Sequence, residues 1–252
     1  MRANGNPDIH PPHLDQSAAD GVNFDRCFVQ NPVCMPSRVS FLTGQYPSTL
    51  GITHMGVPVP EETVTLPRLL GPCGYRSANI GKLHFLPHAN RDHRTHHPDY
   101  GFDRLDIRDE PGTYEDAYRA WVRRKAPEQL PHISVGLAPL TEVWYDVMNV
   151  RDHGQHPTER FPKRPVPTRC TDDVTQAAFV AEQSIEFMRQ QVQSGQPFLC
   201  IASIYSPHSP WVAPQQYFDL YDPDELHLPS FPPEVDSQRG PDNFSDEELR
   251  LA

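Results

Sequence analysis

A continuous apolar run stands out near the end of the chain, over Pro197–Tyr205, and it leads into the polar segment Ser-Pro-His-Ser-Pro-Trp at 206–211. A short run of this kind is typical of a strand buried on both faces, so we expect it to be a central strand of a sheet. A second strand is predicted over Tyr75–Ile80, just ahead of Lys82. Because open α/β sheets bind ligands at the carboxyl ends of their strands, the residues after both strands are candidates for a site.

Apolar residues at helical spacing mark the other elements. The most regular series predicts an amphipathic helix and consists of Val174, Ala177, Ala178, Ala181, Ile185, Met188 and Val192. Asp172 and Asp173 stand at its start, where carboxylates stabilise a helix, and we expect them to cap it rather than to bind a metal ion. Shorter helices are predicted over 17–21, 36–42, 63–70 and 114–125.

Composition narrows the possible functions. The chain has 252 residues, enough for one large α/β domain with a sizeable core. Its formal net charge of −11 argues against general nucleic-acid binding, since polyanions need a basic surface. We expect no membrane span, because no apolar stretch approaches the length that crosses a bilayer. The five cysteines have no close spacing, which indicates neither a disulfide framework nor a zinc site.

Cys34 lies just ahead of Pro36, a natural first-turn helix residue because proline lacks the N–H that would be unpaired there. The residue at 34 is therefore expected to face a helix N-terminus, where free N–H groups and the helix dipole favour a thiolate or a bound sulfate or phosphate ester. Arg38, one turn along, can reach back to it. The alternative is a buried apolar thiol at 34 and a surface cation at 38.

The run Cys-Met-Pro-Ser-Arg-Val-Ser-Phe-Leu-Thr-Gly over 34–44 resembles the sulfatase signature, Cys-x-Pro-Ser-Arg followed by Leu-Thr-Gly. In that family the cysteine is oxidised after translation to formylglycine, an aldehyde whose hydrate is the nucleophile. The resemblance implies that Cys34 is the precursor of that nucleophile. It also implies a formylglycine-generating or equivalent maturation enzyme as a partner.

Two later segments resemble further sulfatase blocks. Gly-Lys-Leu-His over 81–84 is similar to the Gly-Lys-x-His block, whose lysine and histidine hold the sulfate ester and assist the leaving group. Alternating residues of an extended segment share a face, so Lys82 and His84 are expected to point into one pocket. Pro-His-Ser-Pro over 207–210 is similar to the block whose histidine contacts the sulfate, which implies that role for His208. The flanking prolines exclude a helix and favour an extended loop, although His208 could instead merely end a strand.

The resemblance implies an alkaline-phosphatase-like α/β/α sandwich with a mostly parallel central sheet, incomplete at both ends. Residues 1–252 are interpreted as a partial N-terminal catalytic domain, without the smaller C-terminal subdomain and with a loop-rich insertion at about 111–170. The family uses a divalent cation, calcium, which needs six or more oxygen ligands. Only residue 34, as formylglycine, can be named as a metal ligand, and the remaining ligands are expected outside the chain.

The implied reaction is hydrolysis of a sulfate ester, carried by a small molecule or a sulfated glycan. One hydroxyl of the hydrated aldehyde at 34 attacks sulfur, and the other then expels sulfate. Arg38, Lys82 and His208 would offset charge on the nonbridging oxygens, with Lys82 or His84 donating a proton toward the leaving group.

Two other functions stay open at this point. A phosphonate or phosphate ester hydrolase of the same superfamily needs a similar pocket, because both reactions handle tetrahedral oxyanions. The second is a truncated, non-catalytic protein. Metal and nucleophile must act together, so the isolated chain is expected to turn over little substrate. The substrate alcohol, the oligomeric state and the compartment are not indicated by the sequence.

Overall fold

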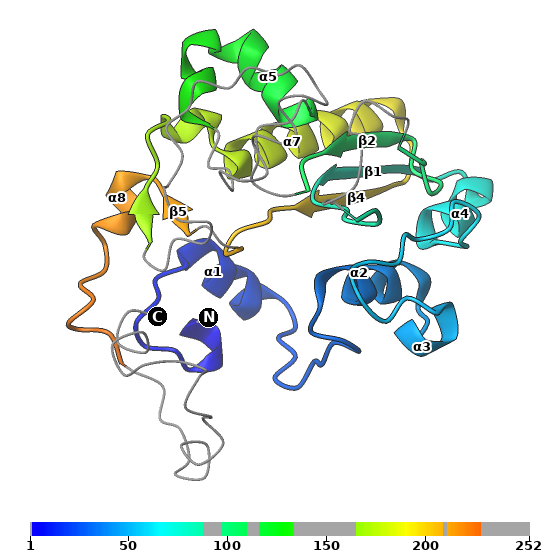
Figure 1. Ribbon diagram of the computed structural model, residues 1–252, viewed down its shortest axis with the longest axis horizontal. Helices are drawn as coiled ribbons and strands as arrows, with labels where there is room; N and C mark the ends of the chain where they lie inside the picture. The colour runs from blue at the N-terminus through cyan, green and yellow to red at the C-terminus, as the bar shows by residue number, and fades with distance from the viewer. Residues whose placement is uncertain (1, 88–96, 110–115, 134–164, 209–210, 228–252) are drawn as a thin grey trace. The chain divides into compact units, whose positions relative to one another are not determined.

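The computed structural model describes residues 2–87, 97–109, 116–133, 165–208 and 211–227. The chain divides into two compact units, the larger formed by Gln30–Gln215 and the smaller by Met1–Val29 with Gln216–Ala252. The larger unit contains the sheet and every predicted site residue (Figure 1).

A parallel three-stranded sheet, in the order β2-β1-β4, is the centre of the larger unit. Its strands are β1 (Arg76–Gly81), β2 (Arg104–Ile107) and β4 (Phe198–Ser203). The register pairs Gly81 with Ser203, so β1 and β4 end side by side. A separate pair of short parallel strands joins β3 (Val166–Pro167) to β5 (Val212–Ala213).

Helices cover both faces of the sheet, which gives the expected α/β/α sandwich (Figure 1). One face packs against α5 (Ala117–Lys125) and α7 (Gln176–Ser194), in a core cluster that includes Ile80 and Phe179. The other face packs against α2 (Cys34–Thr43), in a cluster that includes Val39 and Leu83. Within β1 and β2 the residues that enter a cluster are two apart, as the pleat requires, and β4 contributes to both clusters.

The remaining described helices are short. They are η1 (Arg2–Asn4), α1 (Pro12–Asp20), α3 (Pro47–Leu50), α4 (Leu66–Leu70), η2 (Gly71–Cys73), η3 (Pro127–His132), η4 (Asp172–Val174) and α8 (Gln215–Phe218). The predicted helices at 17–21, 36–42, 63–70 and 114–125 correspond to α1, α2, α4 and α5, with shifted ends. None of the described helices is long and apolar enough to cross a membrane.

The position predicted for the strand at 197–205 is wrong within the described sheet. β1 is the central strand and β4 lies at the edge, where its residues are mostly half-buried. The apolar run arises because β4 contacts both core clusters, through Phe198 and Cys200 on one face and Ile201 on the other. An apolar run indicates that both faces of a strand are covered by other elements. It does not indicate how many strands pair with it.

The cap predicted for the long helix is also wrong. Asp172 and Asp173 belong to the 3-10 turn η4, and the side chain of Thr175 caps α7 by accepting from the N–H of Ala178 at 3.2 Å. A threonine hydroxyl directly before the first helical residue is closer to the unpaired N–H groups than carboxylates two and three residues earlier.

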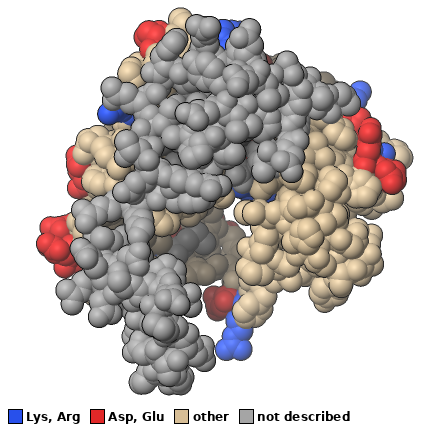
Figure 2. All heavy atoms as spheres, in the orientation of Figure 1, with Lys and Arg blue, Asp and Glu red and all other residues tan. Residues whose placement is uncertain are grey.

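The insertion expected at about 111–170 is only partly described. It contains α5 and η3, while 110–115 and 134–164 lie outside the described residues. The surface formed by 39–60, which includes the second half of α2 and all of α3, is uncharged, because this stretch contains no Asp, Glu, Lys or Arg. Figure 2 shows this area in tan on the visible face, and Phe41 is 73% exposed within the stretch.

Candidate active site

The site begins where β1 and β4 end together. Gly81 pairs with Ser203 across the two strands, and the N–H of Lys82 donates to the carbonyl oxygen of Ser203 at 2.9 Å. Gly81 has φ of +97°, and a Cβ atom there would lie 2.0 Å from that same oxygen. Only glycine allows the two backbones to approach this closely, so Gly81 fixes where Lys82 leaves the sheet.

Cys34 is the first residue of α2, which begins two residues earlier than predicted. Pro36 lies in the first turn, where its missing N–H costs no hydrogen bond, and the N–H of Ser37 already donates to the carbonyl oxygen of Val33. The Cys34 side chain is half-buried rather than enclosed, so the alternative of a buried apolar thiol is wrong. Residue 34 is open to a reactant at a helix N-terminus, where negative charge is favoured.

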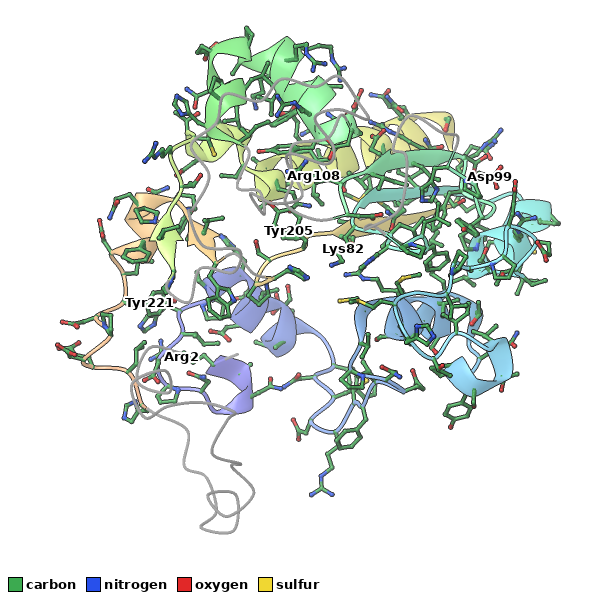
Figure 3. All side chains as sticks on the ribbon, viewed as in Figure 1. Arg2, Lys82, Asp99, Arg108, Tyr205 and Tyr221 are labelled. Atoms are coloured by element: carbon green, nitrogen blue, oxygen red, sulfur yellow. The ribbon has the colours of Figure 1, made fainter. Side chains whose placement is uncertain are left out.

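Lys82 comes close to Cys34. Its Nζ lies 4.0 Å from the Cys34 Sγ, and its side chain is almost completely buried. Figure 3 shows Lys82 between the sheet and α2. A buried ammonium beside residue 34 makes that position locally positive in a chain of net charge −11.

Arg38 joins α2 to both strand ends. Its Nη1 donates to the carbonyl oxygen of Lys82 at 2.9 Å and to the hydroxyl of Ser203 at 3.1 Å. The alternative of a surface cation at 38 is therefore wrong, because the guanidinium is half-buried and bonded to the sheet. Ser203 is a site residue that the sequence analysis missed, and its place at the end of a strand was the available signal.

His84 lies close to Lys82 in sequence but not in the extended conformation expected. β1 ends at Gly81, and His84 has φ of 55°, which is unusual for a residue with a side chain. The prediction for Lys82 and His84 assumed an extended segment over 82–84, and that assumption is wrong. The N–H groups of Leu83 and His84 both donate to Oδ1 of Asp109 at 2.8 Å, and the sequence analysis also missed this aspartate.

His208 follows β4 on the same edge of the sheet as Lys82, but not in the extended loop expected. Residues 205–208 form a turn, closed by the N–H of His208 donating to the carbonyl oxygen of Tyr205 at 3.0 Å. Prolines on either side exclude a helix but permit a turn. The contact of His208 with a bound sulfate stays a prediction.

The structure thus brings Cys34, Arg38 and Lys82 together through direct contacts, with Ser203 completing the group. The Lys82 ammonium lies beside one potential nucleophile at a helix N-terminus, and the Arg38 guanidinium is bonded to the ends of the two strands that meet there, at the carboxyl edge of a parallel sheet. Such an arrangement can hold a tetrahedral oxyanion and offset the negative charge that develops on it.

Comparison with known proteins places the chain. The family model described as Sulfatase matches residues 1–227. The chain belongs to the sulfatase family. It is similar to the ulvan-active sulfatase of Formosa agariphila, with 27% identity over 93% of this chain and 38% of the relative. An arylsulfatase of Clostridium perfringens is 29% identical over 91% of this chain and 44% of the relative, so the chain spans about two fifths of these sulfatases.

Solved structures show the same fold. A phosphonate monoester hydrolase of Silicibacter pomeroyi aligns with a TM-score of 0.65 and 23% identity, over 91% of this chain and 43% of the other. A phosphonate monoester hydrolase of Agrobacterium radiobacter aligns with a TM-score of 0.63 and 22% identity, over 90% and 42%. These similarities confirm the alkaline-phosphatase-like architecture expected for a sulfatase.

In the part that the structure describes, no group of three or more His, Cys, Asp or Glu side chains could hold a metal ion. A calcium ion takes six to eight oxygen ligands. The described residues therefore do not form a calcium site by themselves.

Proposed function

We propose that the protein carrying this chain hydrolyses sulfate esters, with residue 34 as the origin of the nucleophile. The observation that carries the proposal is the 4.0 Å approach of the Lys82 ammonium to the Sγ of Cys34, within the sulfatase signature. Relatives named as sulfatases align over nine tenths of the chain and support the same reaction class.

The position of Cys34 fits a formylglycine, since its side chain is accessible and lies at a helix N-terminus beside a cation. A formylglycine at 34 would supply a hydrated aldehyde, whose hydroxyls open the ester and then release sulfate. A maturation enzyme that oxidises Cys34 is part of the proposal.

The other side chains have separate roles in the proposal. Lys82 and Arg38 offset the charge on the nonbridging sulfate oxygens, which is worth most where water is excluded, and Lys82 is nearly inaccessible. Lys82 or His84 donates the proton that the leaving alcohol needs. His208 contacts the sulfate from the turn that follows β4.

Calcium belongs to the proposal through the family resemblance alone. The described residues offer no set of ligands for it. Residue 34 is the only position in this chain that we propose as a metal ligand.

The substrate class is an anionic sulfate ester, either a small aryl sulfate or a sulfated glycan. The names of the two relatives, an ulvan-active sulfatase and an arylsulfatase, support this range. A small positive site within an acidic chain favours a compact anion over a polyanion such as nucleic acid.

Mass spectrometry of the peptide that contains residue 34 tests the nucleophile directly. Conversion of Cys34 to the aldehyde lowers the peptide mass, and an unmodified cysteine leaves it unchanged. In the full-length protein, Cys34→Ala should lower kcat for an aryl sulfate by roughly 10⁴-fold or more, as loss of a catalytic nucleophile does. Cys73→Ser is the matched control, because Cys73 is an exposed thiol at the end of η2, and it should leave kcat unchanged.

Parallel assays with an aryl sulfate and a phosphonate monoester separate the two hydrolase functions. We expect the sulfate ester to give the higher kcat/KM. A dominant rate with the phosphonate would replace sulfate by phosphonate as the substrate class, and no hydrolysis of either ester by the full-length protein would contradict the proposal.

A further inference from the structure

Asp109 is a buried carboxylate that accepts hydrogen bonds from two backbone N–H groups. It lies two residues after β2, is only 1% exposed, and accepts through Oδ1 from the N–H groups of Leu83 and His84, each at 2.8 Å. Hydrogen bonds to an ionised acceptor are roughly twice as strong as those between neutral groups. The carboxylate therefore stabilises one particular path of the chain just after β1.

That path is one the chain does not adopt readily. Gly81 and His84 both have positive φ values, +97° and 55°, so the chain turns sharply on each side of Lys82. For a residue with a side chain, such as His84, this conformation persists only where neighbouring groups hold it. Asp109 binds the backbone N–H of that same residue.

Lys82 is consequently fixed from both sides. Its N–H donates to Ser203 and its carbonyl oxygen accepts from Arg38, both at 2.9 Å, while the next two N–H groups are held by Asp109. The long Lys82 side chain could adopt many conformations, but a fixed backbone and close burial direct its Nζ to Cys34.

We infer that Asp109 is a positioning residue of the active site, which acts through the backbone of 83–84 to hold Lys82 in place beside residue 34. The inference deepens the proposed function and rests on it for the turnover measurement. The inference can also be tested without turnover, by measuring the positive charge near residue 34.

The chain contains a matched control at the other end of the same strand. Asp103, just before β2, accepts from the N–H of Ser77 at 2.8 Å and holds the start of β1 as Asp109 holds the residues after its end. Removing Asp103 should disturb β1 at the edge away from the site. A general loss of stability would therefore appear in both variants, but a loss of positioning only at Asp109.

Alkylation of the Cys34 thiol measures the local charge. The ratio of its rates with anionic iodoacetate and neutral iodoacetamide rises with a nearby positive charge, and peptide mass assigns the product to residue 34. In full-length protein that retains the thiol, Lys82→Met should lower this ratio by at least about 5-fold, because one charge at 4 Å has that effect in bulk water and a larger one at a buried position. Asp109→Ala should lower it about 3-fold or more, while Asp103→Ala should leave it unchanged.

Turnover gives the second measurement. Asp109→Ala should lower kcat for an aryl sulfate about 100-fold, as a misplaced catalytic group does, with KM changed less than about 3-fold. Asp109→Asn keeps an oxygen that accepts both N–H groups and should restore kcat to within about 10-fold of the wild type. Where residue 34 is fully converted to the aldehyde, no thiol remains to alkylate, and kcat alone tests the inference.

The inference is wrong if Asp109→Ala matches Asp103→Ala in both kcat and the alkylation ratio. It is also wrong if Asp109→Ala changes the two alkylation rates equally, since that result indicates general loosening. Failure of the proposed function is distinguishable, because it removes turnover from the wild type and leaves the alkylation ratio to test Asp109.

Discussion

Arg38 Nη1 lies 2.9 Å from the carbonyl oxygen of Lys82, which is 44 residues further along the chain. The same atom reaches the hydroxyl of Ser203, so one guanidinium connects α2 to the ends of both β1 and β4. A planar group with several fixed donors suits this task, and an ammonium does not.

Arg38→Lys should therefore lower kcat/KM for an aryl sulfate by roughly 100-fold, because the shorter, single-centre cation loses contact with one or both acceptors. Steady-state kinetics of the full-length protein give the number. Arg76→Lys, at the opposite end of β1 and more than half exposed, should leave kcat/KM unchanged. Equal activity of Arg38→Lys and the wild type would remove the guanidinium from the mechanism.

Gly81→Ala should reduce the free energy of unfolding by more than about 3 kcal/mol, which denaturant titration measures. The added Cβ would meet the backbone oxygen of Ser203 at 2.0 Å, and neither strand can move aside without breaking the sheet. Gly74→Ala is the control, since Gly74 also has positive φ but nothing lies within 4 Å of its added Cβ. It should cost only about 1 kcal/mol of backbone strain.

The acid stability of the chain should depend on Asp103. Burial raises its pKa, but the N–H of Ser77 and the guanidinium of Arg76 outweigh burial and hold the pKa below the usual value. The ionised form is thus favoured in the folded state, and its contribution is present at neutral pH and lost between about pH 5 and pH 2. Asp103→Asn should lower the unfolding free energy at pH 7 by less than about 1 kcal/mol, because the carboxylate is partly exposed.

Unfolding titrations over that pH range check this prediction. The difference between wild type and Asp103→Asn should shrink as the pH falls. A difference that stays constant down to pH 2 would show that the charge of Asp103 makes no contribution.

Thr175→Ala should destabilise the protein by about 1 kcal/mol, because it removes the oxygen that caps α7. Asp173→Asn should change the unfolding free energy by less than about 0.5 kcal/mol, because its ion pair with Lys125 is long and its side chain exposed. Thermal or denaturant unfolding of both variants gives the comparison. A larger loss of stability in Asp173→Asn than in Thr175→Ala would show that the aspartates cap α7.

The sequence predicted the elements that carry the site better than their surroundings. The helix at Cys34, the strand before Lys82 and the strand before His208 are all present, because local turn chemistry and apolar spacing determine an element's type. The edge position of β4 was not predictable in this way, since it depends on which strands pair across the sheet.

The buried face of α7 was also predicted only in part from the sequence. The predicted stripe includes Ile185 and Val192, which are 42% and 71% exposed, while Phe179 and Phe187 face the sheet. The helical spacing was correct, but two aromatic side chains offer far more apolar area than the alanines of the predicted stripe. Asp109 was missed for a related reason, because it accepts from backbone N–H groups 25 and 26 residues away, and backbone groups carry no sequence signal.

The separation of 165 residues between Arg38 and Ser203 has a consequence for biosynthesis. Ribosomes add about 5 to 20 residues per second, so roughly 8 to 33 seconds pass between the emergence of the two partners. During that interval the guanidinium has no hydroxyl to meet and β1 has no β4 beside it. The group formed by Cys34, Arg38, Lys82 and Ser203 can assemble only after synthesis has passed β4.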